Sequence, residues 1–172
     1  MQRIGVDLGY GWVKVVNEEG HRWAFPSVVA RKLAADPGDV LPGRRNTGLR
    51  ADQLEVAIKP LQPQVGPEET YLVGTLALKA PQATRPFADD KAHAAANQTL
   101  TAVALALAMQ RHGEDIHVAT GLPYAQFIRR EFRRSLAEAL EGREWIVRFP
   151  RGGNTARRVR IAKVNVYPQA VG

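Results

Sequence analysis

An acidic residue, a glycine-rich turn and a lysine follow one another near the start of the chain. Asp7 interrupts a short apolar run, the turn Gly9-Tyr10-Gly11 follows it, and Lys14 lies in the next apolar run. Glycines let a backbone approach a bulky anion, and N–H groups exposed in a turn can hydrogen-bond phosphate oxygens. The ammonium group of Lys14 would add a positive charge for the same phosphates. The Asp7 carboxylate would hold Mg²⁺ through water, because magnesium keeps most of its hydration shell. The pattern therefore favours a site for nucleotide phosphates and Mg²⁺.

An ordinary hairpin explains the same residues, with a turn that needs glycine and an acid that caps it. The chain contains neither the GxxxxGK[ST] sequence of a P-loop nor the GxGxxG sequence of a dinucleotide-binding fold. The choice between the two interpretations stays open on this segment alone.

Other catalytic chemistry has little support. The chain has no cysteine, which excludes disulfides and thiolate sites, and its four histidines lack the spacing of a metal site. Neither serine lies in a GxSxG sequence. No apolar run is long enough to span a bilayer, and the first residues do not resemble a signal peptide, so we expect a cytoplasmic protein with no membrane partner.

The net charge of +7 comes entirely from the C-terminal third of the chain. Residues 1–121 contain 13 basic and 13 acidic residues, whereas residues 122–172 contain 11 basic and 4 acidic ones. Such asymmetry is typical of a nucleic-acid surface, of a site for an acidic partner, or of a contact with an acidic part of the same molecule. A solvated basic face without a specific partner is the fourth interpretation.

Hydrophobic periodicity predicts an α/β domain. Runs at 4–8, 12–16 and 21–25, separated by short polar turns, predict a three-stranded antiparallel meander. Proline and glycine between residues 28 and 69 predict an irregular insertion with at most one strand, at 54–58. The remaining predicted elements are a strand at 71–73, helices at 86–112 and 125–140, a strand at 116–119, and a hairpin of 145–149 with 159–166.

Taken together, these segments resemble the actin-like ATPases, especially the ParM-type plasmid-segregation actins and their archaeal relatives. The resemblance covers nearly the whole chain, and its first and last segments are the most specific. The segments that carry it are Asp7-x-Gly9-Tyr10-Gly11-x-x-Lys14, Phe25-Pro26-Ser27, Tyr71-Leu72-Val73-Gly74, Thr120-Gly121-Leu122-Pro123 and Val164-Asn165-Val166-Tyr167-Pro168-Gln169-Ala170.

The resemblance implies an RNase H-like, actin-type domain in which a three-stranded antiparallel meander is extended by parallel strands, with helices on the faces. It implies ATP (or GTP) and Mg²⁺ as cofactors, with Gly9, Tyr10, Gly11 and Lys14 at the phosphates. Asp7 would hold the Mg²⁺ through water, and Gln169 would orient the attacking water. A neutral amide suits that role because it donates and accepts hydrogen bonds without titrating.

The resemblance also implies a larger assembly. Residues 1–172 would form the N-terminal domain, with about 28–70 as an inserted small subdomain that contacts the next protomer of a filament. A second nucleotide-binding domain is absent from this sequence, so we expect weak nucleotide binding by this part alone. The expected partners are further copies of the protein and a DNA-bound adaptor, in plasmid or DNA segregation.

Two alternatives remain. One is another ATPase of the actin, chaperone and sugar-kinase superfamily that does not polymerise. The other is a basic module that binds nucleic acid or a protein partner directly and has no ATPase activity, with Arg129, Arg130, Arg133 and Arg134 as its centre.

Overall fold

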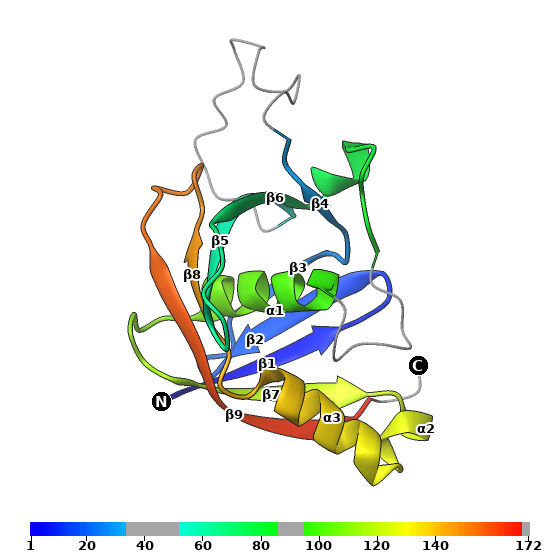
Figure 1. Cartoon of the computed structure of the whole chain (residues 1–172). Helices are drawn as coiled ribbons and strands as arrows, with labels where there is room; N and C mark the ends of the chain where they lie inside the picture. The colour runs from blue at the N-terminus through cyan, green and yellow to red at the C-terminus, as the bar shows by residue number, and fades with distance from the viewer. Residues whose placement is uncertain (34–51, 86–94, 170–172) are drawn as a thin grey trace.

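A computed structural model describes residues 1–33, 52–85 and 95–169. Its strands form one strongly curved, nine-stranded sheet in the order β3-β2-β1-β7-β9-β8-β5-β6-β4 (Figure 1). In chain order the elements are β1 (Gln2–Leu8), β2 (Trp12–Asn17), β3 (Arg22–Pro26), β4 (Val29–Arg31), β5 (Gln53–Gln62), β6 (Glu69–Gly74), the 3₁₀ turn η2 (Ala77–Lys79), α1 (Ala95–Ala108), β7 (Ile116–Leu122), α2 (Tyr124–Phe127), α3 (Arg130–Leu140), β8 (Glu144–Arg148) and β9 (Arg157–Pro168).

The first half of the sheet confirms the predicted fold class. Strands β1, β2 and β3 pair antiparallel as a meander, and β7 and β9 extend it with parallel pairing to β1 and to β7. Helix α1 packs on one face of these strands, and α3 contacts β9. This arrangement is the meander-plus-parallel-strands architecture of an actin-type α/β domain.

The long strand β9 joins the two halves of the sheet. Residues 157–160 pair antiparallel with β8, and residues 161–168 pair parallel with β7. The predicted hairpin is therefore confirmed at its closed end, where 144–147 pair with 157–160, and the rest of the predicted second strand pairs with β7 instead. Its connection uses two left-handed residues, Gly153 and Asn154, with φ of 87° and 55°.

Helix α1 lies between the two halves of the sheet (Figure 1). The sequence predicts that the spacing of Leu100, Val103 and Leu107 turns one side of the helix to the core. In the structure every residue from Leu100 to Ala108 is buried, because β4, β5 and β8 contact the helix in addition to the strands of the meander. The many alanines suit this position, since small side chains let strands approach from several directions. No helix within the described ranges is long and apolar enough to cross a membrane.

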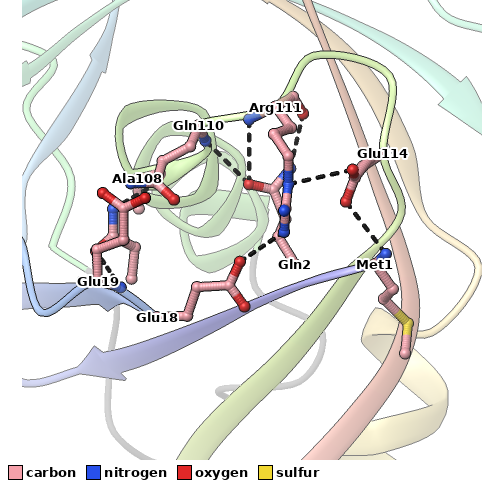
Figure 2. A network of polar contacts seen from close by, with 9 residues as sticks. Met1, Gln2, Glu18, Glu19, Ala108, Gln110, Arg111 and Glu114 are labelled. Atoms are coloured by element: carbon pink, nitrogen blue, oxygen red, sulfur yellow. Dashed lines mark hydrogen bonds and ion pairs between the residues drawn. The ribbon is translucent and has the colours of Figure 1, made fainter.

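Helix α1 ends at Ala108, so the predicted end at residue 112 is wrong; the predicted start, 86–94, lies outside the described residues. The buried side chain of Gln2 intercepts the backbone groups that would continue the helix. Its Oε1 accepts a hydrogen bond from the N–H of Gln110 at 2.9 Å, and its Nε2 donates to the carbonyl of Arg111 at 2.8 Å (Figure 2). A residue from β1 therefore caps a helix about a hundred residues later in the chain, which no local pattern indicates.

Arg111 extends the same polar network. Its guanidinium contacts Glu18 at 2.6 Å and Glu114 at 3.1 Å, and Glu114 also contacts the amino group of Met1 at 3.1 Å (Figure 2). The network holds the N-terminus and the β2–β3 turn against the end of α1.

The interpretation of residues 28–69 as an irregular segment with at most one strand is wrong. The predicted strand at 54–58 is confirmed as part of the ten-residue β5, but the stretch also contains β4, and β6 begins within it. Strand β5 continues through Pro60 because a register shift between Pro60 and Gln62 accommodates the residue that lacks an N–H group. Residues 34–51 lie outside the described ranges.

The predicted helix at 125–140 is divided into α2 and α3. Arg129 adopts an extended conformation, with φ of −90° and ψ of 118°, and interrupts the helical backbone. Leu136 and Leu140 are buried as the four-residue spacing predicts, but Ile128 is exposed because it lies at the break. Arg133 of α3 bridges the break, because its guanidinium donates a hydrogen bond to the carbonyl of Phe127 in α2.

Candidate nucleotide-phosphate site

The alternation of β1 separates core residues from residues available for chemistry. Ile4, Val6 and Leu8 are buried in the core that contains α1. Gly5 and Asp7 lie on the other face of the strand and are only partly buried. Asp7 therefore lies near the end of β1 on its partly exposed face, and the opposite face of the strand packs in the core.

Lys14 lies directly opposite Asp7 in the register of β1 and β2. Residues opposite each other in an antiparallel pair project from the same face of the sheet. Both line a pocket of about 600 Å³, together with Gln169, Thr120 and Gly121. No hydrogen bond or ion pair joins the ammonium group of Lys14 to another described residue. The pairing of β1 with β2 thus places the Asp7 carboxylate and the Lys14 ammonium group at the same pocket.

Gln169 reaches the same place from the end of β9. Its backbone N–H donates to the carbonyl of Leu122 at 2.8 Å, which fixes it beside β7. Its side-chain Nε2 then donates to Oδ1 of Asp7 at 2.6 Å, across a sequence separation of 162 residues. The structure therefore brings together Asp7, Lys14 and Gln169.

The turn between β1 and β2 lies beside this pocket and does not line it. The N–H of Gly9 donates to the carbonyl of Trp12 at 3.0 Å, and a Cβ at Gly9 would lie only 2.7 Å from that oxygen. At Gly11 a Cβ would meet nothing within 4 Å, and φ is not in the left-handed region. Tyr10, between them, is 61% exposed. The fold thus requires glycine at position 9 and leaves position 11 open.

Ser27 is a residue that the sequence analysis did not single out for a role. It is completely buried, its Oγ donates to the carbonyl of Gly9 at 2.7 Å, and its N–H donates to the carbonyl of Gly11 at 3.0 Å. These two bonds clamp both ends of the turn to the residue after β3. A serine directly after Pro26 was the available signal, because a short hydroxyl side chain next to a strand end often bonds a neighbouring backbone.

The described residues contain no group of three or more histidine, aspartate or glutamate side chains that could hold a metal ion by themselves. A single carboxylate facing an open pocket does fit Mg²⁺ that arrives with a nucleotide, since such an ion is held by one or two carboxylates, by phosphate oxygens and by water. Asp7 is the residue that would hold it, through water. When bound, the ion would neutralise phosphate charge at this position.

The basic C-terminal third has a different organisation. Burial lowers the pKa of Arg143 and of Arg157, and both guanidinium groups donate to backbone carbonyls, of Ala139 and of Ala106 in α1. Most of the other arginines contact acidic side chains of the domain. These pairs are Arg134 with Glu138, Arg148 with Glu68, Arg151 with Glu55, Arg158 with Glu144, and Arg160 with Asp115.

The sequence model described as "Actin like proteins N terminal domain" matches residues 5–172. The chain belongs to this family. No curated protein matches the sequence.

Solved structures of actin-like proteins resemble the domain over almost its whole length. The ParM of a 15-stranded filament from Clostridium botulinum is 26% identical with a TM-score of 0.77, and a non-polymerisable mutant of pCBH ParM is 27% identical with a TM-score of 0.73. Each similarity covers 98% of this chain and 47% of the other. The archaeal actin homologue Ta0583, solved with ADP, is 22% identical with a TM-score of 0.68, covering 98% and 44% of the two chains, and supports the fold alone. This actin-like domain spans about half the length of these relatives.

Proposed function

We propose that this actin-like domain binds the phosphates of Mg-ATP (or Mg-GTP) and works with a second nucleotide-binding domain as a filament-forming ATPase. The observation that carries the proposal is the convergence of Asp7, Lys14 and Gln169 on one pocket. A nucleotide is consistent with the shared fold, because structures of this fold were solved with ADP, for Ta0583, and with ATP, for the ParM of Bacillus thuringiensis.

Each residue has a distinct task in this proposal. Lys14 contributes positive charge to the phosphates, and the open position at Gly11 in the Gly9–Gly11 turn lets an anion approach the backbone. Asp7 holds the Mg²⁺ through water, and Gln169 orients the water that attacks the terminal phosphate. Catalysis of phosphoryl transfer depends mainly on positioning and charge, so groups held on the ends of β1, β2 and β9 suit the reaction.

The proposal extends to filaments for plasmid or DNA segregation in the cytoplasm. ParM of C. botulinum was solved as a filament, and this domain shares its fold over nearly all its length. The segment 28–70 would be the small subdomain that contacts the next protomer, and a DNA-bound adaptor would link the filament to its cargo. Direct binding of nucleic acid remains the alternative: several arginines of the basic third contact carboxylates or carbonyls of the domain, whereas Arg129 and Arg130 are exposed.

Binding of Mg-ATP to this chain tests the phosphate site directly, by calorimetry of wild type, Lys14→Ala and Lys163→Ala. Lys163 is an exposed lysine outside the pocket, so its loss changes the net charge equally. We expect Lys14→Ala to weaken binding at least about tenfold, since a charged hydrogen bond contributes about 1.5–3 kcal/mol. Equal affinities of the two variants would refute the assignment of Lys14.

Turnover requires the protein that carries both domains. There, Asp7→Ala should abolish phosphate release and filament growth, whereas Gln169→Ala should slow hydrolysis and leave filaments that persist longer. Phosphate release and filament sedimentation measure the two effects. Normal turnover in Asp7→Ala would contradict the proposed role of the carboxylate.

A further inference from the structure

Gly121 lies on β7 directly beneath the side chain of Gln169. A Cβ built on Gly121 would be 2.6 Å from Cγ of Gln169, 3.4 Å from its Cδ and 3.5 Å from its Nε2. Non-bonded carbon atoms come no closer than about 3.5 Å without repulsion. Any residue other than glycine at position 121 would therefore occupy the space that the Gln169 side chain uses.

The backbone of β7 gives no other reason for glycine here. The φ of Gly121 is not in the left-handed region, and the residue pairs regularly with Tyr167 of β9. Glycine within a strand weakens the strand, and its presence often marks a close approach of another group. At position 121 that group is the side chain of Gln169.

The clash could not be relieved at the flexible end of the side chain. The backbone of Gln169 is fixed by its bond to Leu122, and the position of Cγ then depends only on χ1. A change of χ1 to another staggered rotamer would swing the whole amide away. The hydrogen bond of Nε2 to Asp7 would then be lost.

We propose that Gly121 is a positioning residue. Because it has no Cβ, the Gln169 side chain can pass over it and reach Asp7. The consequence for hydrolysis rests on the proposed function, because it assumes that Gln169 orients the attacking water. The steric coupling between positions 121 and 169 does not depend on that assumption.

Thermal unfolding of this chain tests the coupling through a double-mutant cycle of Gly121→Ala and Gln169→Ala. We expect Gly121→Ala to lower Tm by about 5 °C in the wild-type background, and to have almost no effect in the Gln169→Ala background, where Cγ is gone. The control is Gly5→Ala, whose Cβ would contact Val16 at 3.1 Å and not Gln169, so its effect should be the same in both backgrounds.

The side-chain amide of Gln169 reports its position in NMR spectra, with its signal assigned by its loss in Gln169→Ala. The signal should shift in Gly121→Ala and in Asp7→Asn and should stay in place in Gly5→Ala. A Tm loss of equal size in both backgrounds, with an unmoved amide signal, would overturn the proposal and leave Gly121 as a packing residue.

Hydrolysis supplies the functional readout in the protein with both domains. Gly121→Ala should reduce kcat about a hundredfold, since misplacing a reacting group by about 1 Å has such an effect, and should change the affinity for Mg-ATP by less than about twofold. Normal kcat in Gly121→Ala would overturn the positioning role. Absence of ATP binding and turnover in wild type would instead refute the proposed function, while the unfolding cycle would still decide the coupling.

Discussion

The β1–β2 hairpin and the basic C-terminal third both contain charged residues, but they use them differently. In the hairpin, Asp7 and Lys14 stand opposite each other and face an open pocket. In the basic third, Arg157 donates a hydrogen bond to the carbonyl of Ala106, and Arg160 forms an ion pair with Asp115. Several charges of the basic third therefore bond within the domain, whereas those of the hairpin face a pocket that a ligand could enter.

This difference explains why net charge is a weak guide to the function of this domain. All of the net positive charge lies in residues 122–172, which left a nucleic-acid surface, an acidic partner, an acidic part of the same molecule and a solvated face as open interpretations of the sequence. The structure shows that Arg157 and Arg160 join β9 to α1 and to the loop before β7, and that Arg151 joins the β8–β9 turn to β5. Burial even lowers the pKa of Arg157, which indicates a packing position rather than a solvated face.

The largest expected effect comes from comparing Gly9, which the fold of the hairpin turn requires, with Gly11, which we propose faces the phosphates. Gly9→Ala should destabilise the domain by about 3 kcal/mol, because its Cβ would lie 2.7 Å from the carbonyl oxygen of Trp12. Gly11→Ala should change the stability by less than about 0.5 kcal/mol and still weaken Mg-ATP binding, since only the open side of the turn is altered. Chemical denaturation and calorimetry measure the two effects. Unchanged binding in Gly11→Ala would show that the turn does not meet the phosphates.

A second comparison tests the structural use of the arginines. Arg157→Met should lower the free energy of unfolding by about 2 kcal/mol, because the carbonyl of Ala106 loses its charged donor within the core. Arg130→Met, at an exposed position, should change it by less than about 0.5 kcal/mol. Neither variant should alter nucleotide affinity. Equal stabilities of the two variants would contradict the proposed division between the two regions.

The smallest expected effect concerns Glu69, whose carboxylate contacts Arg31 of the neighbouring strand β4 and the hydroxyl of Tyr71 in its own strand β6. Burial, and then the hydrogen bond that the Tyr71 hydroxyl donates to Glu69 at 2.6 Å, raise the pKa of Tyr71 from 10.0 to about 12. The folded state thus holds this proton more tightly than the unfolded state. Its stabilising contribution is complete below pH 10 and is lost as the pH rises to about 12.

Glu69→Gln should lower the pKa of Tyr71 towards 10.0 without reaching it, because burial, the largest cause, remains. Ultraviolet absorbance of the tyrosines during an alkaline titration measures the shift. A Tyr71 that titrates at its ordinary value in the wild-type protein would show that the pair with Glu69 does not form in solution.

Local patterns predicted the elements whose signals are local. Alternating residues indicated the meander, and the glycines with Asn154 indicated the β8–β9 hairpin. They failed where a distant side chain decides the outcome. Gln2 ends α1 after Ala108, and pairing with β6 and β8 extends the strand predicted at 54–58 into the ten-residue β5, past Pro60.

The sequence by itself determined the meander and the presence of an acid and a lysine beside a glycine turn, because strand alternation and turn chemistry act over a few residues. The parallel extension followed only from the resemblance to the actin-like ATPases. The tertiary structure alone decided that Gln169 meets Asp7, that Gly121 provides the space for this contact, and that Arg157 bonds the carbonyl of Ala106 in α1. These outcomes depend on which strands become neighbours, since pairing of β7 with β1 and of β9 with β7 brings together residues that are far apart in the chain.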